Sequence, residues 1–510
     1  MKNGKVYLIG AGPGDPGLMT LKGIKCIENA DVVVYDYLAN PELLEYAREG
    51  AEFIYVGKKG GDHTFSQTQI NAMIMEMAKQ GNVIARLKGG DPFIFGRGGE
   101  EAEELAAEGI AFEVVPGVTS AVSVPAYSGI PLTHRDFTSD VAFVTGHEDP
   151  LKNRSSIAWD KISTGIGTLV FLMGVKNLPN IVENLMKNGR DPKTPVALIR
   201  WGTTAKQETL TGDLETIVRL AEKNSFTPPA IAVVGEVVKL RERLSWFETK
   251  PLFGKKIIVT RARSQASELS HLLREYGADP IEFPTIEILP PESFDALDEA
   301  IDHLERYDWL ILTSVNGVKY FLERLRNRER DIRDLKGIKI CTIGPRTADE
   351  LEKLGIMIDF VPEEYRAESI IEGLKERGIR GKKILLPRAE EAREVLPEEI
   401  RNSGGRVDVV TAYRTVRPLE RRDTVKKLFQ EGSIHVITFT SSSTVKNFVE
   451  MFEKQEILPL LKKVTTASIG PITAETAASL GIKTHIMPQE YTIPALTEAI
   501  VEYFVQKTEV

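Results

Sequence analysis

The second half of the chain repeats itself, and this repeat constrains the possible folds more than any other feature. Segments that begin at residues 254, 309 and 342 return in the same order 127, 127 and 126 positions later. The pairs read GKKIIVTRA and GKKILLPRA, WLILTSVNGV and VITFTSSSTV, and TIGPRTADELEKLGI and SIGPITAETAASLGI. Ordered matches at one spacing predict a duplicated α/β unit. Two similar lobes facing each other would form a cleft, and clefts between domains are favoured ligand sites.

The first half alternates apolar runs with amphipathic helical patterns. The runs predict strands at Val6–Gly10, Val32–Tyr35, Phe53–Val56, Val83–Leu87 and Phe112–Val115. A further α/β unit is predicted from runs at Val141–Thr145, Thr168–Leu172, Pro195–Arg200 and Ala230–Val234. Such alternation indicates mostly parallel sheets covered on both faces. The stretch Arg241–Phe253 loses this rhythm, which places the main linker near Lys250.

Composition bounds the compartment and the partners. A chain of 510 residues suggests about three or four domains. Its only cysteines are Cys26 and Cys341, so a disulfide framework is not indicated and a reducing compartment fits. The N-terminal segment is a poor signal peptide, and no apolar stretch approaches the roughly 20 residues that span a bilayer. We therefore expect a cytoplasmic protein without a membrane partner, and the net charge of −8 argues against nucleic acid.

The glycine-rich segment GAGPGDPG follows the first predicted strand. Its Gly12-x-Gly14-x-x-Gly17 spacing matches a dinucleotide fingerprint, but such a match is weak alone. Pro13 and Pro16 remove two N–H donors from the loop that would hold a pyrophosphate. Two interpretations stay open at this point: a tight turn, or a backbone that a ligand approaches closely.

Charged and glycine-rich segments follow the other predicted strands as well. Asp36 ends the second strand, and segments 57–61, 88–96 and 116–120 follow the next three. Ligands of open α/β sheets bind beyond the carboxyl ends of the strands. Each segment alone is more often a plain turn, but together they predict a binding site at this edge.

The first half resembles the uroporphyrinogen-III C-methyltransferase branch of the tetrapyrrole methylases. The resemblance covers roughly residues 1–245, and it rests on GAGPGDPG, DVVVYD, VGKKGGDH, RLKGGDPFIFGRGGEE, VVPGVTSAVSVPAYSGIPLTHRD, FLMGV and WGTTAKQ. It implies a methyltransferase domain over 1–248, with subdomains of about 1–118 and 119–248 and a linker at 249–253. It also implies a ligand between the subdomains and a homodimer formed through this half.

The resemblance assigns roles residue by residue. Asp36 would be the base and Lys58 the acid, although Lys58 could instead anchor a substrate carboxylate or be a solvated loop lysine. Contacts to S-adenosylmethionine would come from Pro13, Gly89, Gly90, Asp91, Ile94, Thr119, Ser120, Met173 and Gly202. Asp91 could alternatively cap a turn before a proline. Arg97 and Arg135 are candidate contacts to substrate carboxylates, and His134 receives no catalytic role.

These residue types suit the implied reaction. The tetrapyrrole carbon is an electron-rich nucleophile that attacks the sulfonium methyl in line, so positioning supplies much of the acceleration. The methylated ring carries positive charge until it loses a proton. A carboxylate such as Asp36 can stabilise that charge or take the proton.

Residues 254–510 resemble uroporphyrinogen-III synthase. The signs are KKIIVTRA, LTSVNGV with FTSSSTV, IGPRTA with IGPITA, and AYRT at 412–415. The resemblance implies two flavodoxin-like lobes, one from about 254–286 plus 415–505 and the other from about 287–414. The implied substrate is hydroxymethylbilane, a linear tetrapyrrole with eight carboxylates, which is closed with inversion of the last ring.

The second site would hold its substrate mainly through neutral donors. Tyr413 matches the family tyrosine proposed to assist departure of the hydroxyl, with aromatic packing as the alternative. Hydroxyls at predicted helix starts, where N-capping is the alternative role, are those of Thr313, Ser314, Thr347, Thr440, Ser441, Ser442 and Thr473. Arg261 and Arg263 follow the first strand, where they would meet substrate carboxylates.

The two resemblances predict a bifunctional enzyme of tetrapyrrole biosynthesis. It would close hydroxymethylbilane to uroporphyrinogen III and methylate that product twice from S-adenosylmethionine to precorrin-2, for siroheme or cobalamin, without a metal. One alternative is a nicotinamide-dependent dehydrogenase. Another is a methylase of a different corrinoid precursor or of a protein, with a non-catalytic two-lobed ligand-binding module behind it.

Overall fold

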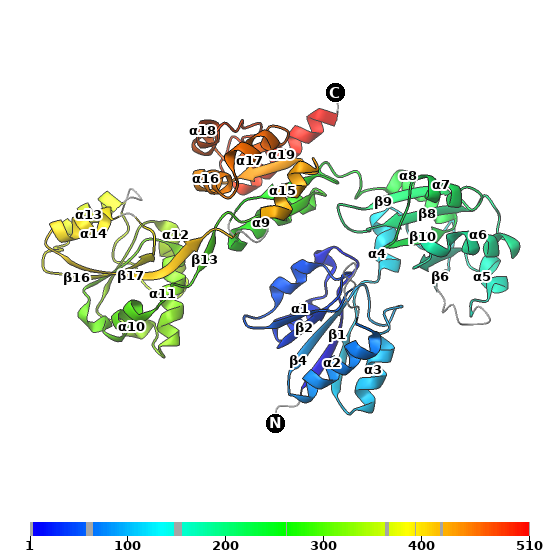
Figure 1. The fold of residues 1–510 in the computed structure, drawn as a ribbon, viewed down its shortest axis with the longest axis horizontal. Coiled ribbons are helices and arrows are strands. Elements are labelled where there is room, and N and C mark those ends of the chain that lie inside the picture. Colours follow the sequence, from blue (N-terminus) through cyan, green and yellow to red (C-terminus); the bar gives the residue numbers. More distant parts are fainter. Residues whose placement is uncertain are drawn as a thin grey trace. The chain divides into compact units, whose positions relative to one another are not determined.

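A computed structural model of the chain describes residues 4–57, 65–146, 156–261, 263–362, 367–392, 394–418 and 422–508. The chain divides into two compact units, Met1–Ile257 with His271–Pro280 and Ile500–Val510, and Ile258–Ser270 with Ile281–Ala499. Strands and helices alternate in both units (Figure 1).

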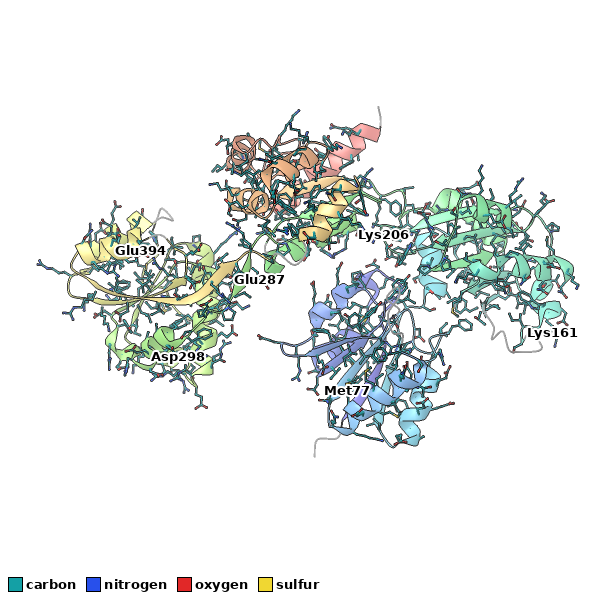
Figure 2. All side chains as sticks on the ribbon, viewed as in Figure 1. Met77, Lys161, Lys206, Glu287, Asp298 and Glu394 are labelled. Carbon is teal, nitrogen blue, oxygen red and sulfur yellow. The ribbon has the colours of Figure 1, made fainter. Side chains whose placement is uncertain are left out.

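The first sheet is parallel and has the strand order β3-β2-β4-β1-β5. Its strands are β1 (Lys5–Gly10), β2 (Val32–Tyr35), β3 (Glu52–Tyr55), β4 (Val83–Lys88) and β5 (Ala111–Val115). Its helices are η1 (Pro16–Leu18), α1 (Leu21–Glu28), η2 (Pro41–Tyr46), α2 (Gln67–Lys79) and α3 (Gly98–Ala107). Ile9 and Leu87 face the core under α1, whereas Leu8 and Ile84 face the core under α2 and α3. Met77 of α2, labelled in Figure 2, packs against the second of these cores.

The second sheet is mixed, with the order β6-β7-β10-β8-β9. Its strands are β6 (Val141–Thr145), β7 (Thr168–Leu172), β8 (Pro195–Arg200), β9 (Glu208–Asp213) and β10 (Ala230–Val234). Only the β6–β7 pair is parallel, so the expectation of a mostly parallel sheet is wrong here. β9 joins β8 as an antiparallel edge strand with no buried residue, which explains why its sequence gave no apolar run.

Short helices cover this second sheet. They are α4 (Ser120–Tyr127), α5 (Trp159–Gly165), η3 (Val175–Asn177), α6 (Leu178–Lys187), α7 (Ile217–Lys223), η4 (Glu236–Leu240) and α8 (Arg241–Leu244). The irregular stretch after α8 is anchored to α4 and to β9: Trp246 Nε1 donates to Ala126 O at 2.9 Å, and Thr209 Oγ1 donates to Glu248 Oε1 at 2.6 Å.

The third sheet has the order β12-β11-β18-β19. Its strands are β11 (Lys256–Val259), β12 (Asp279–Glu282), β18 (Val436–Phe439) and β19 (Thr465–Ser468). Its helices are α9 (Arg263–Glu275), α15 (Arg422–Gln430), α16 (Ser442–Glu450), α17 (Lys454–Leu461), α18 (Pro471–Ser479) and α19 (Ile493–Thr508). Phe283, Phe439 and Phe448 are fully buried in its core.

The fourth sheet has the order β13-β17-β16-β14-β15 and is parallel except at the β13–β17 pair. Its strands are β13 (Glu287–Leu289), β14 (Trp309–Leu312), β15 (Lys339–Thr342), β16 (Lys383–Ala389) and β17 (Arg406–Val416). Its helices are α10 (Asp295–Asp302), η5 (Leu304–Arg306), α11 (Val315–Asn327), η6 (Ile332–Leu335), α12 (Pro345–Glu352), α13 (Ala367–Glu376) and α14 (Val395–Asn402).

The sequence repeat corresponds to repeated elements. β11 matches β16, β14 with α11 matches β18 with α16, and β15 with α12 matches β19 with α18. The duplicated α/β unit is therefore confirmed, as is the predicted fold class of two α/β domains followed by two α/β lobes.

Candidate functional sites

Glycine backbones meet at the carboxyl edge of the first sheet. Gly12 and Gly90 form an antiparallel bridge, with N–H···O distances of 3.2 and 2.7 Å. A Cβ at Gly117 would lie 2.3 Å from Gly90 O, and a Cβ at Gly10 would lie 2.5 Å from the Gly117 Cα. Side chains are excluded from this crossing, so three of the predicted strand-end segments share one edge.

Asp91 fastens two of these loops together. Its Oδ2 accepts from Gly117 N at 3.0 Å and its Oδ1 accepts from Phe93 N at 2.8 Å. Each carboxylate oxygen therefore satisfies a backbone donor, the turn-capping role that was the alternative for this residue. A contact from Asp91 to a methyl donor remains a prediction.

The GAGPGDPG loop is built differently from a dinucleotide-binding loop. It leads into the short helix η1, and α1 begins only at Leu21 with Thr20 as its N-cap, so none of its glycines opens that helix. Asp15 N donates to Thr203 Oγ1 at 3.1 Å, and the Tyr127 hydroxyl donates to Asp15 Oδ2 at 2.7 Å. The Asp15 N–H, a donor of the kind that a pyrophosphate site needs, is thus used to bind Thr203, and the Asp15 carboxylate adds a negative charge that would repel a pyrophosphate.

The other predicted cofactor contacts follow strands of the first sheet or strands of the second sheet. A Cβ at Gly90 would lie 3.6 Å from Ser120 N and 3.7 Å from Thr119 Cα, so these residues adjoin at the start of α4. Gly202 follows β8, and its carbonyl oxygen lies 3.3 Å from the position of a Cβ at Gly14. The remaining positions are Gly89 after β4, half-buried Pro13, exposed Ile94, and Met173 at the end of β7 with φ +57°.

Asp36 lies at the carboxyl end of β2, with about a quarter (26%) of its side chain exposed. Its Oδ1 accepts from Leu38 N at 2.9 Å, and its Oδ2 lies 3.6 Å from Arg86 Nη2. The next residue, Tyr37, has an exposed ring that packs edge-on against the exposed ring of Trp201, which follows the second sheet's strand β8. The two ring centroids lie 6.0 Å apart. Lys58, the predicted acid, lies outside the described residues.

Arg97 is not a free cation in this structure. It has a left-handed backbone (φ +57°) and forms a two-point ion pair with Glu100, at 3.0 Å from Nε and 2.6 Å from Nη2. This contact raises the pKa of Arg97 and lowers the pKa of Glu100. A substrate carboxylate would have to share or displace Glu100. Arg135 is exposed.

Three buried charged residues next to Asp36 were missed from the sequence. Arg86 and Lys88 lie on the central strand β4, and Glu101 lies in the first turn of α3. Lys88 Nζ donates to Glu101 Oε1 at 2.6 Å. Burial and the neighbouring Arg86 lower the pKa of Lys88. The available signal was VIARLK, in which two basic residues alternate within an apolar strand.

In the fourth sheet, Tyr413 and Ser314 meet. Tyr413 lies on β17 and is 8% exposed, and its hydroxyl lies 3.0 Å from Ser314 Oγ. Ser314 is the N-cap of α11, where it accepts from Gly317 N at 2.9 Å. Tyr320 stacks on the Tyr413 ring at 5.8 Å. Tyr413 is therefore packed by its ring, and its hydroxyl contacts the same serine that caps α11.

The repeated unit places matching hydroxyls in the third sheet. Ser441 is the N-cap of α16, and Ser442 Oγ donates to Ile472 O at 3.1 Å. Thr313 and Thr440 precede the two caps, and Thr347 and Thr473 are buried in the first turns of α12 and α18. All the predicted hydroxyls thus lie at helix starts.

The arginines after the repeated strands differ in their surroundings. Burial lowers the pKa of Arg261, which follows β11. Its repeat counterpart, Arg388 on β16, is buried and paired with Glu394, the residue labelled in Figure 2. The sequence repeat indicated the position of Arg388, but no role was predicted for it. Arg263 begins α9, and its side chain lies outside the described set.

The described ranges give no sign of a metal centre or of a membrane-spanning helix. They contain no group of three or more His, Cys, Asp or Glu side chains that could hold a metal ion. They also contain no helix long and apolar enough to cross a membrane.

Comparisons with known proteins match each half separately and the chain as a whole. Residues 5–218 match the Tetrapyrrole (Corrin/Porphyrin) Methylases, and residues 267–498 match Uroporphyrinogen-III synthase HemD. The porphyrin biosynthesis protein HemD of Ruminiclostridium josui is 38% identical over 502 residues, 98% of each chain. The uroporphyrinogen-III C-methyltransferase of Priestia megaterium is 53% identical over 235 residues, 46% of this chain and 98% of the relative. A solved uroporphyrin-III C-methyl transferase from Thermus thermophilus, complexed with S-adenyl homocysteine, is 39% identical and covers 46% of this chain and 99% of its own, with a TM-score of 0.40.

The fold and its two groups of strand-end residues define a fusion of two α/β enzymes. The chain belongs to the tetrapyrrole methylases through its first half and to the uroporphyrinogen-III synthases through its second half. It is a bifunctional enzyme of tetrapyrrole biosynthesis, with uroporphyrinogen-III C-methyltransferase and uroporphyrinogen-III synthase activities.

Proposed function

We propose that the second half closes hydroxymethylbilane to uroporphyrinogen III and that the first half methylates this product twice to give precorrin-2. The glycine crossing at the carboxyl edge of the first sheet, with Asp36 on the neighbouring strand, is the observation that carries the methylation proposal. S-Adenosylmethionine would supply an electrophilic methyl group at this edge.

The loops from Gly89 to Asp91 and from Gly117 to Ser120 would hold the methyl donor. The bare Gly90 backbone leaves room for close approach, since a Cβ there would meet nothing nearer than 3.6 Å. Asp91 would contact the methyl donor and also keep the two loops in register, through its bonds to Gly117 N and Phe93 N. The family resemblance implies that the contacts are completed by Pro13, Ile94, Met173 and Gly202.

Asp36 would accept the proton that the methylated ring must lose. Its Oδ1 is fixed by Leu38 N, while its partial exposure lets a ring approach the carboxylate. Lys58 would supply a proton or bind a substrate carboxylate. Arg97 and Arg135 would bind the acidic substituents of the macrocycle, with Arg97 released from Glu100.

In the synthase half, the Tyr413 hydroxyl would assist departure of the substrate hydroxyl. Ser314 Oγ lies 3.0 Å from the Tyr413 hydroxyl and would orient the proton of that tyrosine hydroxyl. The hydroxyls and N–H groups at the starts of α11, α12, α16 and α18 would bind and fold the open tetrapyrrole. Arg261 and Arg263 would meet its carboxylates.

We also propose the limits of the parts: methyltransferase 1–248 with subdomains of about 1–118 and 119–248, linker 249–253, and synthase 254–510. Its lobes would comprise about 254–286 plus 415–505, and about 287–414. Cytoplasmic location and homodimerisation through the methyltransferase half belong to the same proposal.

A coupled assay tests the proposed reactions. The purified chain is given hydroxymethylbilane alone, and the oxidised products are separated into type I and type III isomers. Type III porphyrin is expected, whereas only type I would refute the synthase proposal and favour a non-catalytic module. S-Adenosylmethionine with a ¹³C-methyl group is then added, and two labelled methyl groups per macrocycle are expected; tight NAD binding without labelling would favour the dehydrogenase.

A further inference from the structure

A buried cluster of charges adjoins Asp36. Arg86 and Lys88 point from β4 toward the face covered by α2 and α3, and their side chains are only 4% and 5% exposed. An unpaired charge that is buried in this way costs free energy, so each of the two cations needs an anionic partner in the buried region between the sheet and the helices. Among the residues that the structure describes, the anions paired with this cluster are Glu101 and Asp36.

Glu101 is the central anion. It is 3% exposed, and its Oε1 accepts from Lys88 Nζ at 2.6 Å and from Gln67 Nε2 at 2.8 Å. The same oxygen lies 3.6 Å from Arg86 Nε. Three donors of positive or partly positive charge thus converge on one oxygen, and Oε2 is buried without a hydrogen-bond partner among the described residues.

Arg86 is shared between two carboxylates. Its Nη1 donates to Leu87 O at 2.9 Å, while Nη2 lies 3.6 Å from Asp36 Oδ2 and Nε lies 3.6 Å from Glu101. A closed arginine–carboxylate pair has two bonds of about 2.7–2.9 Å. Neither contact of Arg86 is closed in this way, although the described residues of the cluster are two cations and two anions, whose charges balance.

We propose that Glu101 is a positioning residue for methylation, which holds Arg86 and Lys88 back so that Arg86 does not close on Asp36. The Asp36 carboxylate then keeps an oxygen for the proton of the ring. This inference rests on the proposed role of Asp36. Without Glu101, Asp36 would be the only anion left for both cations among the described residues, and Arg86 would form a closed ion pair with it.

Glu101→Gln in the full chain tests this role. Glutamine keeps the shape of the side chain and an acceptor for Lys88 and Gln67, but it removes the charge. We expect kcat for methylation of uroporphyrinogen III to fall about 10–100-fold, the range for misplaced catalytic groups, with both KM values within about twofold of wild type. Ring closure should be unchanged. Glu104→Gln, at an exposed position of the same helix, is the matched control.

A second variant separates positioning from simple charge balance. If Glu101 only neutralises Lys88, the double variant Lys88→Met/Glu101→Gln regains both the wild-type melting temperature and the wild-type kcat, and the inference is overturned. If Glu101 acts through Arg86, the melting temperature recovers but kcat stays low. If Glu101→Gln alone folds poorly, this double variant still tests whether Glu101 acts through Arg86.

Combination with Asp36→Asn separates this inference from the proposed function. Single-turnover methylation by Asp36→Asn/Glu101→Gln should equal that of Asp36→Asn, because effects through one group are not additive. If adding Glu101→Gln lowers the rate of Asp36→Asn as much as it lowers the rate of the wild type, the positioning role of Glu101 is overturned. The proposed role of Asp36 is then unaffected. Wild-type methylation by Asp36→Asn would overturn the proposed base itself.

Discussion

The two halves place different chemistry at equivalent points, the carboxyl ends of parallel strands. The first half gathers carboxylates, buried cations and bare backbone, with Asp36, Arg86 and the Gly12–Gly90 crossing within one edge. The second half gathers hydroxyls, with Tyr413 on Ser314 and a matching cap at Ser441. Each set suits the reaction of its own half.

The difference follows from what each reaction asks of the protein. Methylation creates a cationic ring that must lose a proton, so a carboxylate with a controlled counter-ion is needed. Ring closure starts from an alcohol that leaves readily, so the protein mainly has to fold the substrate. Neutral donors at helix starts bind a polyanion without fixing a single charge geometry.

Asp36→Asn should have the largest effect of the substitutions that test this contrast. Removing the base should lower methylation by about 10²–10⁴-fold, the usual contribution of a general base. Ring closure should stay within about twofold, because Asp36 belongs to the other half. Methyl incorporation and isomer analysis on one preparation measure both rates. Equal loss of both activities would contradict independent sites.

Tyr413→Phe should give the reverse pattern with a smaller loss. The ring and its stacking on Tyr320 remain, but the hydroxyl that contacts Ser314 is lost. We expect ring closure to fall about 10–100-fold, below the upper range for a lost transition-state hydrogen bond, and methylation to be retained. Tyr320→Phe is the control, since its hydroxyl donates to Ile288 O at 3.1 Å. Equal losses in both variants would mean that the Tyr413 hydroxyl has only a structural role, like that of Tyr320.

Gly117→Ala probes the bare backbone of the first half. The added Cβ would meet Gly90 O at 2.3 Å, so the loops must separate. Such overpacking costs about 1–3 kcal/mol and should lower the melting temperature and weaken binding of S-adenosylhomocysteine. Gly165→Ala, where a Cβ meets open space, should change neither. Unchanged binding in Gly117→Ala would separate the crossing from the donor site.

Much of the fold was predictable because strands in the interior of a sheet that is covered on both faces have continuous apolar runs, whether they pair parallel or antiparallel. β2, β6, β7, β8 and β10 have the predicted bounds, and the predicted ends of β1, β3, β4 and β5 are within one residue. Edge strand β9 was not predictable in this way, since its residues Glu208–Asp213 are not buried. The mixed order of the second sheet depends on strand pairing, which an apolar run does not encode.

The site was predictable in position more than in contacts. The strand-end motifs identified the edge where Gly12, Gly90 and Gly117 meet. They did not indicate that Asp91 satisfies two backbone donors, or that Arg97 is paired with Glu100. Such contacts depend on loop geometry and on residues close together only after folding.

Replacement of the paired caps Ser314 and Ser441 by alanine should give the smallest effects, and the difference between them is informative. Each loses an N-cap, which costs about 1 kcal/mol of stability. Ser314 also contacts the Tyr413 hydroxyl, whereas Ser441 Oγ contacts Ser443. At equal stability, measured by urea unfolding, Ser314→Ala should slow ring closure several-fold more than Ser441→Ala. Equal rates would mean that both serines serve only as caps, and that the hydroxyl of Tyr413 needs no partner to act.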